Sequence, residues 1–85
     1  MPSSTNSPHL LQAVEAALTD DWYTAHKIAQ DYGDSYANWI HAVLHKIEGD
    51  AWNSRYWYAR TDGKKYEDFN DPKAELRAIA QALGT

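Results

Sequence analysis

Apolar residues recur at helical spacing in five stretches of the chain, and no stretch shows the sustained alternation typical of a strand. The clearest apolar stripe lies within residues 36–47. Capping residues precede the stretches, and Gly33, Gly49 and Gly84 follow three of them, with Gly33 expected to be a left-handed cap. The pattern predicts five helices, which begin at Ser7-Pro8, Asp20-Asp21, Asp34-Ser35, Asp50 and Asp71-Pro72.

The first two helices and the next two repeat one pattern at an offset of 29 residues. Asp20-Asp21 followed by Ala25 corresponds to Gly49-Asp50 followed by Ser54. A tight turn followed by a small residue lets two helix backbones approach closely, as in a helical hairpin. The sequence therefore predicts a disordered tail over residues 1–7 and a single all-α domain over residues 8–85. This domain consists of two antiparallel helical hairpins and a C-terminal capping helix.

One part of the repeat resembles a known superfamily. Gly49-Asp50, Ser54, Trp57-Tyr58 and Arg60 resemble the second half of a tetratricopeptide-like repeat. The stretch from residue 39 to residue 50 is also similar to a group of short bacterial proteins to which no activity is attached. The tetratricopeptide resemblance implies a scaffold that binds peptides or partner proteins. The chain departs from the repeat pattern at His41 and His45, where leucine and tyrosine are usual.

Composition and charge narrow the function classes. The chain has no cysteine, which excludes disulfides, thiolate metal sites and cysteine nucleophiles. Its net charge of −4 arises within residues 1–45, which argues against a nucleic-acid partner. No apolar run approaches the length of a membrane span, and the first residues lack the pattern of a signal peptide. We therefore expect a cytoplasmic protein without a membrane or nucleic-acid partner.

Three polar residues of the third helix form a candidate metal site. His41 and His45 are four residues apart and Glu48 follows three residues later, so all three project from one side of a helix. Imidazoles at this spacing chelate zinc in helical sites, and a carboxylate completes a ligand trio. His26 adds a fourth ligand if the hairpins stack as the repeat indicates. The alternatives are an acid–base pair and histidines that only fill a thin core.

The fourth helix has a different character, because its aromatic residues cover more than one face. They cannot all fit inside one small core, and those left exposed suit an interface in which tryptophan, tyrosine and arginine supply most of the energy. The interaction residues predicted here are Trp52, Arg55, Tyr56, Trp57, Tyr58 and Arg60.

Three functions follow from these patterns. The first is a non-enzymatic interaction module of tetratricopeptide-like type, which binds a protein partner or a second copy and needs no cofactor. The second is a helical domain that binds a divalent metal or small ligand through the histidines. The third is a small hydrolase or isomerase that uses the same histidines. No residue is assigned as catalytic, because nothing in the sequence identifies a substrate.

Overall fold

The computed structural model describes residues 7–84, which form five α-helices and one 3-10 turn and contain no strand. The expected all-α class and the five expected helices are confirmed. Ser7 begins the first helix, and residues 1–6 of the predicted tail lie outside the described residues. The elements are α1 (Ser7–Leu18), α2 (Trp22–Ala29), α3 (Ser35–Ile47), α4 (Ala51–Tyr58), η1 (Tyr66–Asp68) and α5 (Pro72–Gly84).

The turns within the two helix pairs share one backbone geometry. Asp20 has a φ of +68° and Gly49 has a φ of +85°, and these residues occupy equivalent places in the repeat. In each turn the next residue, Asp21 or Asp50, donates its backbone N–H to the carbonyl five positions earlier, at 2.8 and 2.9 Å. Glycine adopts this left-handed conformation freely, and aspartate is among the residues that tolerate it best. The two turns that the sequence aligns therefore have the same backbone geometry.

Gly33 does not form the left-handed cap expected after the second helix. Among the described glycines, only Gly49 and Gly63 have positive φ. α2 ends at Ala29, and Gln30 closes it in the right-handed region with its N–H directed at two carbonyls of the last turn. Because the helix is already capped at Gln30, Gly33 belongs to the connection that leads to α3.

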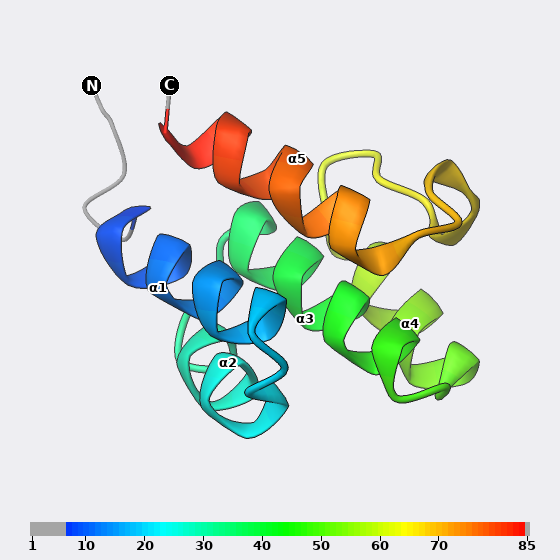
Figure 1. The fold of residues 1–85 in the computed structure, drawn as a ribbon. Helices are drawn as coiled ribbons and strands as arrows, with labels where there is room; N and C mark the ends of the chain where they lie inside the picture. The colour runs from blue at the N-terminus through cyan, green and yellow to red at the C-terminus, as the bar shows by residue number, and fades with distance from the viewer. Residues whose placement is uncertain (1–6, 85) are drawn as a thin grey trace.

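α3 is the central element, since it contacts each of the other four α-helices. α1 packs against α2, and α3 packs against α4. α5 packs on both α1 and α3, and Figure 1 shows it on the opposite side of these helices from α2 and α4. α5 therefore covers one side of the α1–α3 pair, and the outer surfaces of α2 and α4 remain open to solvent.

The apolar core lies between α1, α3 and α5. Leu10, Ile40, Leu44, Leu76 and Ile79 are fully buried at its centre. Complete burial of one such side chain stabilises the fold by about 1.5–3 kcal/mol, so a few large residues suffice for a chain of this size. Within residues 7–84, no helix has both the length and the apolar character needed to cross a membrane.

A buried ion pair joins α5 to the rest of the molecule. The Glu75 carboxylate, which has no exposed surface, lies 2.8 Å from the Lys46 ammonium. Its other oxygen accepts hydrogen bonds from the Trp39 indole at 2.8 Å and the Tyr58 hydroxyl at 2.7 Å. Lys46 also donates to two backbone carbonyls of residues 66–69, at 2.9 and 3.2 Å. The buried charges are thus paired and hydrogen-bonded, as their desolvation requires.

Candidate metal centre

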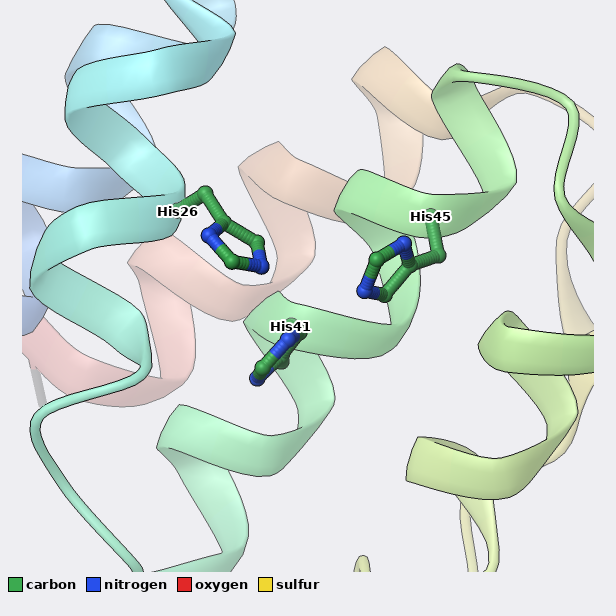
Figure 2. A group of neighbouring side chains, drawn as sticks. All are labelled: His26, His41 and His45. Atoms are coloured by element: carbon green, nitrogen blue, oxygen red, sulfur yellow. The ribbon is translucent and has the colours of Figure 1, made fainter.

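The side of α3 that faces α2 carries two histidines. His41 and His45 lie on successive turns of α3, and His26 lies on α2, which packs against α3. The indole N–H of Trp22 in α2 donates to the Leu44 carbonyl of α3 at 2.7 Å and holds the two helices together near the histidines. Figure 2 shows His26 extending from α2 toward the two imidazoles of α3.

The three imidazoles are close enough to bind one ion. Their ring centroids are separated by 4.6 Å for His26 and His41, 5.0 Å for His41 and His45, and 5.4 Å for His26 and His45. One ring nitrogen from each residue lies within 4.8 Å of those of the other two. A tetrahedral zinc ion with bonds of about 2.0–2.1 Å places its ligand nitrogens about 3.3 Å apart. The separations between the three nitrogens in the structure therefore exceed the spacing in a zinc site by at most about 1.5 Å.

Two tryptophans pack against this histidine cluster of His26, His41 and His45. Trp22 stacks on His26 at 4.7 Å between centroids and meets His45 edge-on at 6.0 Å. Trp57 stacks on His41 at 3.9 Å with an angle of 13° between the ring planes. These contacts restrict rotation of the imidazoles before any ligand binds, which reduces the entropy lost on binding.

The environment favours the neutral form of two of the histidines. His41 is 5% exposed, and burial, followed by the neighbouring His26 and His45, lowers the pKa of His41 to about 4. Burial, followed by His45, also lowers the pKa of His26, and the charge of Glu48 opposes this shift to a smaller extent. At pH 7 both rings are neutral, and a neutral imidazole has the lone pair that binds a metal ion.

Two carboxylates lie at the His45 end of the cluster, where His45, Glu48 and Asp50 place donor atoms within 4.8 Å of one another. The Nδ1 atom of His45 is 2.5 Å from Oε1 of Glu48, a side chain that is 41% exposed. Asp50 caps α4, since it accepts hydrogen bonds from the backbone N–H of Asn53 at 3.2 Å and from its side-chain amide at 2.6 Å. These two bonds lower the pKa of Asp50.

The structure brings together the three histidines that the sequence selects. Glu48 contacts His45 and lies outside the group formed by the three imidazoles. The sequence alone does not identify Trp22 as part of this site, although its position four residues before His26 was an available signal. The stacking of Trp57 on His41 has no sequence signal, because it depends on the rotation of α4 relative to α3.

The residues expected to form an interaction surface divide into an exposed group and an enclosed group. Trp57 is half-buried against His41, and Tyr58 is only 4% exposed because it donates its hydroxyl to the buried Glu75. The exposed group consists of Trp52, Arg55, Tyr56 and Arg60.

The exposed side chains of α4 also contact one another and the segment that follows the helix. Trp52 is 73% exposed and stacks on Tyr56 at 6.0 Å, and the Arg60 guanidinium lies 3.8 Å from the centre of the Tyr56 ring. Arg55 forms an ion pair with Glu67 at 2.6 Å. The exposed surface is therefore an aromatic strip with arginine at its edges.

Comparison of the chain with protein-family models, with curated proteins and with solved structures finds no match in any of the three.

Proposed function

We propose that this chain binds a divalent transition-metal ion, such as zinc, through His26, His41 and His45. The observation that carries the proposal is the convergence of three imidazoles from two helices, with one nitrogen of each within 4.8 Å of the others. Imidazole ligands favour zinc, copper, nickel and iron, whereas magnesium and calcium prefer oxygen ligands. The donor set therefore specifies the class of ion.

The arrangement supports a metal site more specifically than it supports a packed core. A core histidine needs hydrogen-bond partners for its ring nitrogens, but it does not need two further imidazoles within 4.8 Å. Three neutral ligands also leave the full charge of the ion uncompensated and one tetrahedral position open for water or a small anion. The same ion would connect α2 to α3 and stabilise their contact.

The proposal is tested by zinc titration of the purified chain in competition with a chromophoric chelator. We expect one zinc ion per chain, and we expect His26→Ala, His41→Ala and His45→Ala each to lose this binding. His9→Ala is the matched control, because His9 is exposed on α1 outside the cluster. A wild-type chain that does not compete for zinc would refute the proposal, as would equal losses in the control and the cluster variants.

A second candidate function is protein binding through the outer face of α4. Trp52 is 73% exposed and stacks on Tyr56. This pair favours protein binding, because monomeric domains seldom leave adjacent aromatic rings in solvent. The equivalent turns at Asp20 and Gly49 support the resemblance to tetratricopeptide-like repeats, which implies a binding scaffold.

Self-association through this face is tested by sedimentation of the wild-type chain and the Trp52→Ala variant over a range of concentrations. We expect concentration-dependent dimers for the wild type and monomers for the variant, with unchanged helix content by circular dichroism. A wild-type chain that stays monomeric at all concentrations would exclude this form of the second candidate.

A further inference from the structure

We infer that Glu48 is a positioning residue of the proposed metal site, acting through His45 and not as a ligand of the ion. The inference rests on the proposed function and adds to it the residue that selects which nitrogen of His45 binds. Its basis is the 2.5 Å contact between Oε1 of Glu48 and Nδ1 of His45. The two residues are three positions apart at the C-terminal end of α3, so the contact is local and does not depend on the packing of other helices.

The contact determines the tautomer of His45. An imidazole that binds a metal ion carries one N–H and uses its other nitrogen for the ion, and a carboxylate oxygen accepts hydrogen bonds. The hydrogen therefore resides on Nδ1, where it is donated to Glu48, and the lone pair resides on Nε2. Figure 2 shows one ring nitrogen of His45 directed toward His26 and His41. With Nδ1 bonded to Glu48, Nε2 is the nitrogen that remains for the ion.

The two carboxylates beside His45 have different tasks. Asp50 accepts two hydrogen bonds from Asn53 and caps α4, so a bond from Asp50 to the ion would break these hydrogen bonds and remove the cap of that helix. Glu48 is 41% exposed, and its hydrogen bond to His45 is the constraint on its carboxylate. A direct bond from Glu48 to the ion would require loss of that hydrogen bond and of the tautomer it fixes. Carboxylates that hold a metal-binding histidine in this way raise its basicity and fix its orientation, and their removal weakens metal binding about 10–100-fold.

The experiment compares the full-length wild type with Glu48→Ala and Glu48→Gln. Glu67→Ala is the control, because it removes one exposed carboxylate from another segment, where Glu67 pairs with Arg55. Long-range ¹H–¹⁵N NMR of the metal-free proteins at pH 7 gives the tautomer of His45. Chelator competition gives the zinc affinity, and the visible absorption of the Co²⁺-loaded proteins reports the ligand set.

We expect His45 to carry its hydrogen on Nδ1 in the wild type and to lose this preference in Glu48→Ala. Zinc affinity should fall about 10–100-fold in Glu48→Ala. It should fall less in Glu48→Gln, whose amide oxygen still accepts the hydrogen bond, and it should stay unchanged in Glu67→Ala. The Co²⁺ spectra of the wild type and Glu48→Ala should superimpose, because three imidazoles bind the ion in both.

Three results would overturn the inference while leaving the proposed function in place. They are equal zinc affinity in the wild type and Glu48→Ala, a Co²⁺ spectrum that changes when Glu48 is removed, and a metal-free wild type with its hydrogen on Nε2 of His45. A spectral change would make Glu48 a ligand. A wild-type chain that binds neither ion would instead refute the proposed function, and this inference with it.

Discussion

Lowering the pH from 7 to 4.5 is expected to destabilise the folded chain, mainly through His41. Burial, together with the nearby His26 and His45, lowers the pKa of His41 from 6.5 to about 4 in the folded state. In the unfolded chain this imidazole regains its ordinary pKa of about 6.5. Between these two values the unfolded chain binds a proton that the folded chain does not bind, so acid favours unfolding. The stabilisation is present above about pH 6.5 and is lost as the pH falls toward 4.

The size of the effect follows from the two pKa values. One pH unit corresponds to about 1.4 kcal/mol for each proton, so the difference between the unfolded and folded pKa of His41 adds about 3 kcal/mol to the free energy of unfolding at neutral pH. About 2 kcal/mol of this stabilisation is lost when the pH falls to 4.5. The pKa of His26 is lowered as well, and its contribution has the same sign. A domain of this length has a free energy of unfolding of about 4–13 kcal/mol, so the loss is a large part of the total.

The assay is urea denaturation of the metal-free chain at several pH values between 7 and 4.5. The wild type is compared with His41→Gln, and His9→Gln serves as the control because His9 is exposed outside the cluster. We expect the free energy of unfolding of His41→Gln to change about 2 kcal/mol less over this range than that of the wild type. The control should follow the wild type. Parallel curves for the wild type and His41→Gln would refute the account of His41 as a buried neutral imidazole.

Three further predictions concern the scaffold, and urea denaturation measures each. Lys46→Met should lower the free energy of unfolding by about 3–5 kcal/mol, because it leaves the buried Glu75 carboxylate without its cation. Lys73→Met breaks an exposed ion pair and should lower it by less than about 1 kcal/mol. Equal losses in the two variants would contradict the assignment of the Lys46–Glu75 pair as the structurally important one. Asp50→Ala should cost about 1 kcal/mol through loss of the α4 cap, and an unchanged midpoint would contradict it. Ser54→Leu should lower the free energy of unfolding by more than about 2 kcal/mol, because it removes a fully buried hydroxyl that donates to a carbonyl of α3 at 2.7 Å and puts a larger side chain at a buried position. A stable variant would show that α3 and α4 can separate.

The helices and turns could be predicted because their signals are local. Asp50 is followed by helix-forming residues and preceded by Gly49, and the structure has a capped helix and a left-handed turn at these residues. The prediction for Gly33 was wrong, because a glycine after a helix indicates a cap only where the helix extends to it, and α2 ends at Ala29. The spacing of His41 and His45 placed them on one side of a helix, and His26, which the sequence added only on the condition that the hairpins stack, lies beside them in the structure.

The features that depend on contacts between helices could not be predicted. Glu75 lies one position before the buried Leu76 and four before the buried Ile79, so the helical spacing placed it near the core face. A charge at such a position is normally assigned to solvent, and its burial is compensated by partners that are distant in the sequence, the cation of Lys46 and the hydrogen bonds from Trp39 and Tyr58. Trp57 appeared to belong to an exposed aromatic face, but the rotation of α4 places its ring on His41.

Metal binding by His26, His41 and His45 is tested most directly by an NMR titration of the four histidine side chains with zinc at neutral pH. We expect the signals of His26, His41 and His45 to change together and to stop changing at one zinc per chain, while those of His9 stay constant. Signals of the three clustered histidines that remain unchanged in excess zinc would contradict the claim and identify the cluster as part of the packed core.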